Sequence, residues 1–159
     1  MAVSKLQMQT FAGLPDIIGE YVLQIPEERR ILRRGEDGGT WTIEEHLFHL
    51  ADVQPMLLGR MRKILSEENP VIEPYFPENG NGDSRWKSID EALESFRSLR
   101  REQCLLIGSA SEEDLLREAV HGEYERYTIP LILSHMIFHE YWHMYRIEEI
   151  WLTRDGYFS

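Results

Sequence analysis

Apolar residues recur at helical spacing in four long segments of the chain. Segments 7–23, 43–67, 89–109 and 129–153 repeat an apolar residue every three or four positions, as the buried face of an α-helix does. Leu47, Leu50 and Ile64 mark that face in the second segment, and Met136 and Ile147 mark it in the fourth. The pattern therefore predicts four long helices, and no run reads as a confident β-strand.

Capping signals support the predicted starts of three of these helices. TIEE begins at Thr42 and SIDE begins at Ser88, and each places a glutamate three residues after the capping hydroxyl, which is a capping box. Thr128 precedes the fourth helix, and Pro130 occupies its first turn, where a missing N–H is tolerated. The three helices are expected to begin directly after these residues.

Glycine and proline mark the connections between the predicted helices. They are dense in segments 33–40 and 69–85, and segment 109–127 has room for one short helical turn after Ser111. The fold class we predict is all-α, a single four-helix-bundle domain over residues 1–159. An up-and-down arrangement is favoured, and the long connections also allow a crossover.

Composition narrows the class of protein. The chain of 159 residues carries a net charge of −11, which argues against nucleic-acid or anionic-membrane partners because both need basic surface. No signal peptide or membrane-spanning segment is expected from the sequence. Cys104 is the only cysteine, so a disulfide framework is excluded and a cytoplasmic location is the simplest expectation.

Five of the six histidines fall on two predicted helices. His135, His139 and His143 follow one another at four-residue steps, and each step turns only about 40° around a helix. They therefore form one stripe, which lies beside apolar residues and is expected to point inward. Any adjacent pair in the stripe could meet one metal ion.

A third ligand is available from the second helix, where His49 lies about one turn after His46 and on the face between Leu50 and Val53. Three histidines with an open position are typical of a catalytic zinc site. The alternative is a set of core histidines whose hydrogen bonds are satisfied within the protein. Spacing alone leaves both interpretations open.

The stretch HEYWH, from His139 to His143, also matches the H-E-x-x-H pattern of one class of metalloprotease. The third ligand of that class is missing, because Arg146 and Glu149 stand where the extended motif has Gly and His. The metalloprotease is therefore only a remote alternative. We expect Glu140 to be a partly exposed charge or a partner of a ligand, and not a general base.

Two blocks of the sequence resemble the DinB-like (DinB/YfiT) superfamily of metal-dependent proteins. They are WTIEEHLFHLADVQ (41–54) and GEYERYTIPLILSHMIFHEYWHMYRIEEI (122–150). The resemblance implies a four-helix bundle with a metal triad of His49, His139 and His143. His135 matches a histidine that is usually not a ligand, and His46 matches no known role. Where many members have His-Arg-Gly-Gln after the second ligand, this chain continues from His143 with Met-Tyr-Arg.

The resemblance also implies what the site would do. Members bind zinc, nickel or another divalent ion, are often homodimers, and include enzymes that use a low-molecular-weight thiol. We therefore expect thiol-transferase or hydrolase chemistry on a small-molecule substrate. A non-catalytic metal-binding module of a stress response is the competing class.

Several neighbours of the predicted ligands have candidate roles. Trp41, Trp142 and Tyr145 could line the site, although such residues more often pack in a core or an interface. Asp52 could orient His49 or be a solvated charge, and Arg146 is expected to pair with an acidic neighbour on its own helix.

Overall fold

The computed structural model describes residues 2–35, 40–74, 85–154 and 156. Four long helices dominate it: α1 (Lys5–Leu23), α3 (Ile43–Ser66), α4 (Ile89–Ser109) and α6 (Ile129–Leu152). Two single-turn helices, α2 (Glu27–Arg30) and α5 (Glu112–Leu115), lie in the connections. The all-α four-helix-bundle prediction is confirmed, and the long helices begin and end within two residues of the expected positions.

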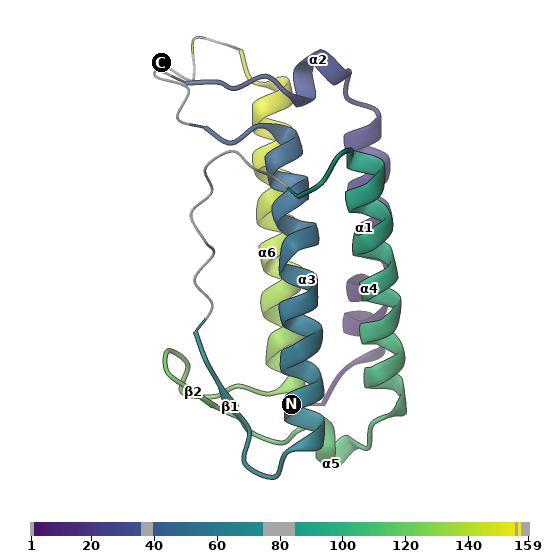
Figure 1. Cartoon of the computed structure of the whole chain (residues 1–159), viewed down its shortest axis with the longest axis vertical. Helices are drawn as coiled ribbons and strands as arrows, with labels where there is room; N and C mark the ends of the chain where they lie inside the picture. Colours follow the sequence, from purple (N-terminus) through teal and green to yellow (C-terminus); the bar gives the residue numbers. More distant parts are fainter. Residues whose placement is uncertain (1, 36–39, 75–84, 155, 157–159) are drawn as a thin grey trace.

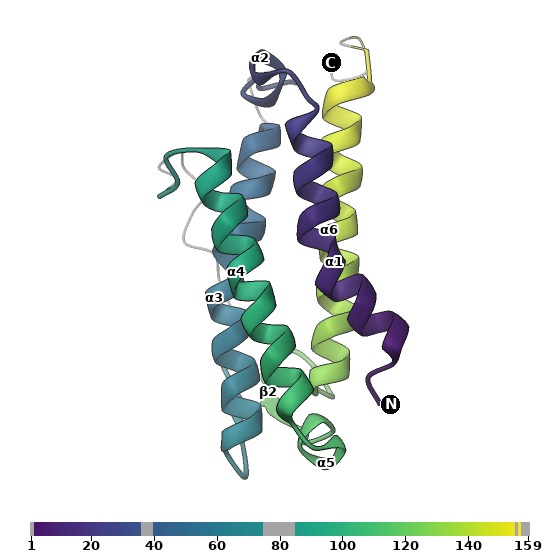
Figure 2. The same ribbon diagram turned by 90° about the vertical axis from the view of Figure 1, so that its right-hand side faces the viewer.

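The long helices form a ring in the order α1, α4, α3, α6 (Figures 1 and 2). Each helix packs against its two neighbours in that order, and the buried apolar residues of all four meet in one core. Helix α6 therefore lies between α1 and α3, so it can present one face to each of them.

The connectivity is up, down, down, up, so the favoured up-and-down arrangement is wrong. Helices α3 and α4 are parallel, since Asp52 near the start of α3 pairs with Arg85 before α4, and Arg62 near its end pairs with Glu102. The crossover connection lies between these two helices. Parts of two predicted connections, 36–39 and 75–84, lie outside the described residues.

The predicted helix caps are present in part. The Thr42 hydroxyl accepts the Glu45 N–H and the Glu45 carboxylate accepts the Thr42 N–H, which completes the capping box of α3. Ser88 caps α4 through its hydroxyl, but the Glu91 carboxylate accepts from the Lys87 N–H instead of from Ser88. Thr128 makes no side-chain cap, and the short turn after Ser111 forms as α5.

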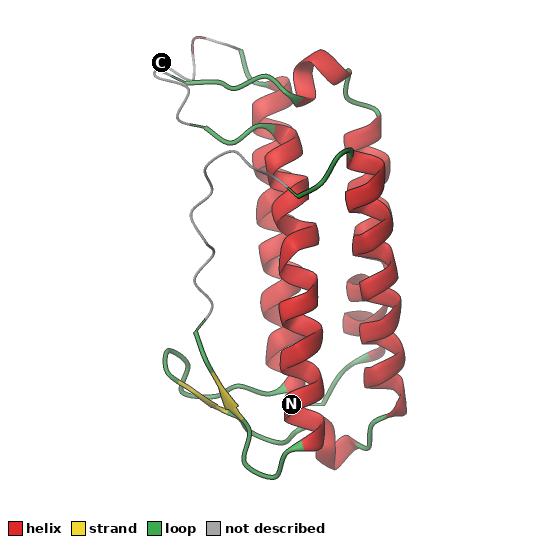
Figure 3. Cartoon of the chain, in the orientation of Figure 1, coloured by secondary structure: helices red, strands yellow, loops and turns green. Residues whose placement is uncertain are grey.

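Two short strands, which the sequence pattern did not predict, lie beside the helices near the end of α3 and the start of α6 (Figure 3). Strand β1 (Val71–Ile72) pairs in parallel with β2 (Val120–His121), so Ile72 faces His121. This pairing brings the connection before α6 against the connection after α3. In the described part of the chain, no helix is long and apolar enough to cross a membrane.

Candidate metal centre

Three histidine nitrogens converge between α3 and α6. His49 comes from the second turn of α3, and His139 and His143 come from successive turns of α6. The Nε2 atom of His139 lies 3.2 Å from that of His49 and 3.2 Å from that of His143. One ligand nitrogen from each of the three residues lies within 4.8 Å of the other two. Because α3 and α6 are antiparallel neighbours, one histidine of α3 meets a pair on α6.

Two of the three nitrogen–nitrogen distances match those between imidazoles bound to one metal ion. Zinc–nitrogen bonds are about 2.0–2.1 Å, so two nitrogens on a tetrahedral zinc lie roughly 3.3 Å apart. The two nitrogen–nitrogen distances of 3.2 Å are close to that value. Among the described residues, no second group of three histidine, cysteine or acidic side chains comes together in this way.

His46 contacts His143, one of the three predicted ligands. The sequence alone did not predict this contact. The Nδ1 atom of His46 lies 2.7 Å from Nδ1 of His143, and both side chains are buried. One of these nitrogens donates and the other accepts. If His143 binds a metal through Nε2, its Nδ1 carries the proton and donates to His46, which fixes the orientation of the ligand ring. The sequence signal was the His-x-x-His spacing of His46 and His49 on α3.

The surroundings keep these imidazoles neutral. Burial, reinforced by neighbouring histidines, lowers the pKa of His139 to about 4 and that of His143 to about 2. Burial and the nearby Arg146 lower the pKa of His46 to about 4, and burial lowers the pKa of His49. A neutral imidazole has a free lone pair, so the cluster is ready to bind a cation near neutral pH.

Tryptophans cover one side of the cluster. The Trp41 ring stacks on His143 with ring centroids 6.1 Å apart and also contacts His46 and His49. Trp142 meets the edge of His143 but stays half exposed, and Tyr145 is exposed. Trp41 is therefore a wall of the site.

A cavity of ≈ 200 Å³ lies beside the cluster and is lined in part by His49 and His139. We call it the histidine cavity, and its lining includes both ligand and non-ligand histidines: His49, Val53, Met56, Arg60, His121, Glu123, Tyr124, His135, Met136 and His139. His135 is exposed at this cavity, so the expected inward stripe holds only for His139 and His143. The cavity gives a small molecule access to the cluster.

The acidic residue of the protease-like motif lies elsewhere. Glu140 is fully buried and forms an ion pair with Arg100 of α4, so the expectation of a partly exposed charge is wrong. The Arg100 guanidinium also donates to Gln54 and to the Phe11 carbonyl, and it stacks 3.7 Å from the Phe11 ring centroid. The Gln103 side chain also belongs to this buried cluster, since it accepts a hydrogen bond from Arg100 and donates one to Gln54. The geometry excludes Glu140 as a general base for the histidine cluster.

The sequence analysis also proposed roles for Asp52 and Arg146. Asp52 accepts from the Trp86 indole and pairs with Arg85, so it anchors the segment before α4 and is not a hydrogen-bond partner of His49. Arg146 pairs with Glu149, one turn further along α6, which confirms the expected surface pair.

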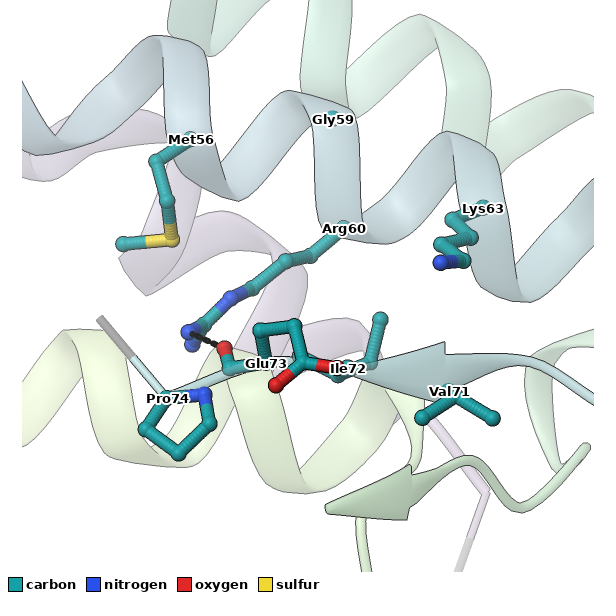
Figure 4. Close-up of a pocket in the computed structure, with 8 residues that line it drawn as sticks. All are labelled: Met56, Gly59, Arg60, Lys63, Val71, Ile72, Glu73 and Pro74. Carbon is teal, nitrogen blue, oxygen red and sulfur yellow. Dashed lines mark hydrogen bonds between the residues drawn. The ribbon is translucent and has the colours of Figure 1, made fainter. Parts of the chain in front are cut away.

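A second groove of ≈ 330 Å³ lies between α3 and β1 (Figure 4). Met56 and Arg60 line both this groove and the histidine cavity. The Arg60 guanidinium donates to the backbone oxygen of Glu73, which ties the strand segment to α3. Arg60 thus forms part of the partition between the two spaces.

Comparisons with known proteins identify the family and the fold of the chain. The family model of the DinB superfamily matches residues 19–147. A protein of Oceanobacillus iheyensis, provisionally named a metal-dependent hydrolase, is 25% identical over 149 residues, which cover 89% of this chain and 82% of that protein. The solved structure of YfiT from Bacillus subtilis superposes with a TM-score of 0.78 at 22% identity, covering 94% of this chain and 89% of that one. YfiT is described as having an unusual four-helix-bundle topology and, provisionally, as a metal-dependent hydrolase.

Proposed function

We propose that this chain, which belongs to the DinB superfamily, binds a divalent metal ion through His49, His139 and His143 and uses it to act on a small molecule. One observation carries the proposal: three neutral imidazole nitrogens converge beside a cavity. If the histidines were only core residues that bond to one another, no cavity beside them would be expected. If they held a structural metal ion, a fourth protein ligand would be expected.

A divalent ion held there would acidify a coordinated water or thiol and so supply a nucleophile near neutral pH. The chain's own residues would do the rest. His46 holds the His143 ring in place, Trp41 excludes water from the covered side, and the histidine cavity receives the substrate. All-imidazole ligands suit zinc, nickel and copper, among others, and zinc or nickel is the ion that we favour.

Hydrolysis is the reaction we favour, because the relatives in both sequence and structure are provisionally described as metal-dependent hydrolases. The cavity of ≈ 200 Å³ suits a small substrate and not an extended peptide. Transfer of a low-molecular-weight thiol to an electrophile is the second candidate, since the same open position would accept a thiolate. The two are distinguished by whether water or the thiol appears in the product.

The test is metal-dependent turnover. Protein loaded with zinc or nickel is assayed against small esters and amides, and against an electrophile with cysteine as the thiol, beside the metal-free protein and His49→Ala. Turnover that needs both the metal and His49 is expected. If the wild type binds metal stoichiometrically and turns over none of these substrates, the non-catalytic metal-binding module becomes the better account.

We also propose that the protein is a homodimer that works in the cytoplasm as a single domain. Helix α6 carries four exposed aromatic residues, Phe138, Tyr141, Trp142 and Tyr145, which is more apolar surface than a solvated helix face needs. Light scattering after gel filtration measures the mass, and Phe138→Glu should convert a dimer to a monomer if this face is the interface.

A further inference from the structure

A cleft of ≈ 420 Å³ lies between helices α1 and α4, which run side by side in Figure 2. We call it the α1–α4 cleft, and its lining comes from positions 12–16 of α1 and 97–105 of α4. It has about twice the volume of the histidine cavity, and the two linings have no residue in common. The histidine cluster lies between α3 and α6, on the other side of the ring of helices. The cleft is therefore separate from the proposed metal site.

A buried arginine forms the floor of this cleft. Pro15 lies inside α1 and has no N–H, so the Phe11 carbonyl lacks the donor that an α-helix provides four residues later. The Arg100 guanidinium donates to that carbonyl instead, and it pairs with Glu140 of α6. Only 2% of the Arg100 side chain is exposed. Its charge is balanced by Glu140 and is not available to a ligand.

Arg97 has unused hydrogen-bond donors at the cleft. Its Nε donates to Asp16 at 2.7 Å, and no hydrogen bond joins its two terminal nitrogens to another residue in the described part of the chain. Both nitrogens are accessible, because the buried nitrogens without a partner there belong to other residues. One of them lies against Gly19, where a Cβ atom would come within 2.9 Å of it. The guanidinium is therefore held against α1 while its terminal donors stay unpaired.

Arg101 adds a positive charge at the edge of the cleft. Its guanidinium pairs with Glu94 at 3.1 Å, but the two side chains are 62% and 69% exposed, so the pair adds little stability and exchanges readily. Asp16 is the one acidic residue among the described residues of the lining, and Arg97 balances it. The lining therefore has an excess of one positive charge, although the net charge of the chain is −11.

The rest of the lining is apolar. Ala12 and Pro15 come from α1, and Cys104 and Leu105 come from α4. None of these side chains has a polar group stronger than a thiol. Leu105 is 74% exposed, so a leucine is left in water at the edge of the cleft. An apolar ligand body that covered these side chains would remove their surface from water, which favours binding.

We propose that the α1–α4 cleft binds a small organic carboxylate, whose acid group pairs with Arg97 and Arg101 and whose apolar body packs on Pro15 and Leu105. The two oxygens of a carboxylate match the forked donors of a guanidinium. One negative charge balances the excess charge of the lining, whereas a dianionic phosphate ester would bring one charge too many. The inference does not rest on the proposed metal-dependent function, because the cleft and the histidine cluster share no residue.

The first experiment titrates the metal-free protein with octanoate while the backbone amide signals are followed by NMR. Octanamide, which has the same length and no charge, is the control for apolar binding. Octanoate should cause saturable shifts in residues 12–16 and 97–105, and it should bind at least about tenfold more tightly than octanamide.

Two arginine variants test the charge. In Arg101→Gln, the affinity for octanoate should fall about three- to tenfold while that for octanamide stays the same. Arg62→Gln is the matched control, since Arg62 is a similarly exposed, ion-paired arginine outside the lining, and it should bind octanoate as the wild type does. An Arg101→Gln protein with unchanged affinity for octanoate would contradict the inference.

A second pair of variants tests the location. Ala12→Phe places an aromatic ring in the wall of the cleft, so both octanoate and octanamide should bind at least about tenfold more weakly. Ile17→Phe, on the same helix but outside the lining, should leave both affinities unchanged. Melting temperatures confirm that each variant is folded. Equal binding of octanoate by Ala12→Phe and the wild type would place the ligand elsewhere.

His49→Ala separates this inference from the proposed function. This variant lacks one of the proposed metal ligands, and it should bind octanoate as tightly as the wild type. Loss of octanoate binding would place the carboxylate at the histidine cluster and overturn the inference. Equal affinities for octanoate and octanamide, or no saturable shift in the two segments below the concentration at which octanoate aggregates, would also overturn it. A wild type that binds octanoate but no metal counts against the metal function alone.

Discussion

Two buried polar clusters lie on different faces of helix α6, and they differ in whether the protein completes their interactions. On one face, Glu140 pairs with Arg100, whose guanidinium also donates to Gln54, Gln103 and the Phe11 carbonyl. On another face, His139 and His143 meet His49, and a cavity remains beside them. The first cluster is closed by the protein, and the second is left open.

Consecutive residues of one motif supply both clusters. His139 and Glu140 are neighbours in the chain, but a single residue turns about 100° around a helix, so their side chains face different helices. His139 contacts His49 of helix α3, and Glu140 pairs with Arg100 of helix α4. The glutamate is therefore a structural residue with its partners supplied by the protein, whereas the histidines lie beside a cavity and can still bind a ligand.

The largest effect is expected in the closed cluster. Glu140→Ala leaves the Arg100 charge buried without its partner, which should reduce the free energy of unfolding by about 3–5 kcal/mol. Urea denaturation measures the change. Glu149→Ala is the matched control, because it breaks a partly exposed ion pair on the same helix and should lose at most about 1 kcal/mol. A Glu140→Ala protein of normal stability that no longer binds metal would show that the two clusters are not separate.

The second-largest effect is expected when the metal ion is removed from the histidine cluster. If a divalent ion binds only the folded protein, its presence at 100 times Kd should add about 2.7 kcal/mol to the free energy of unfolding. Thermal melts with zinc and with EDTA measure this difference. In His49→Ala the two melts should coincide, while Asp52→Asn, on the same helix but outside the cluster, should keep the full difference. An equal response to zinc in His49→Ala would contradict the proposed ligand set.

Replacing His46 should have a smaller effect, on metal affinity, because His46 contacts the ligand His143. Replacing it with Phe removes the nitrogen that contacts His143 Nδ1 but keeps an aromatic ring beside Trp41. Loss of a partner of this kind typically weakens metal affinity about 10- to 100-fold. Competition with a zinc-binding dye measures the affinity. Unchanged affinity would mean that His46 is only a packing residue.

The smallest predicted effect is the pH dependence of the free energy of unfolding of the metal-free protein. The pKa of His46 is lowered to about 4 in the folded state, so below pH 6.5 the unfolded chain takes up a proton that the folded chain does not. Stability from this group is complete above pH 6.5 and falls with pH until about pH 4. Between pH 8 and pH 6, His46 should account for a loss of about 0.8 kcal/mol.

Comparing urea melts of the metal-free wild type and His46→Phe at these two pH values isolates the contribution of His46. The variant should lose less stability than the wild type over this interval. Equal losses would mean that His46 is protonated as easily in the folded protein as in the unfolded one.

The long helices were predictable because their periodicity and caps are local properties of the chain. Thr42 and its glutamate, for example, form the predicted capping box. The meeting of His139 and His143 also follows from one helix. The direction of α4 could not be predicted, because no local pattern states whether a long connection crosses the bundle.

The partners of the buried side chains were missed for a similar reason. Glu140 meets an arginine 40 residues away, and His46 meets a histidine 97 residues away. His121 depends on the pairing of two-residue strands that are too short to give a pattern. In each case, a contact between distant segments decides the role of the residue.

We propose that His49, His139 and His143 bind one metal ion and leave a coordination position open toward the histidine cavity. A crystal structure of protein soaked in zinc, with anomalous diffraction data collected at the zinc edge, tests it most directly. We predict one anomalous peak about 2.0–2.1 Å from each of the three Nε2 atoms, with no fourth protein ligand. A peak elsewhere, no peak at this cluster, or a fourth side chain closing the site would contradict the account.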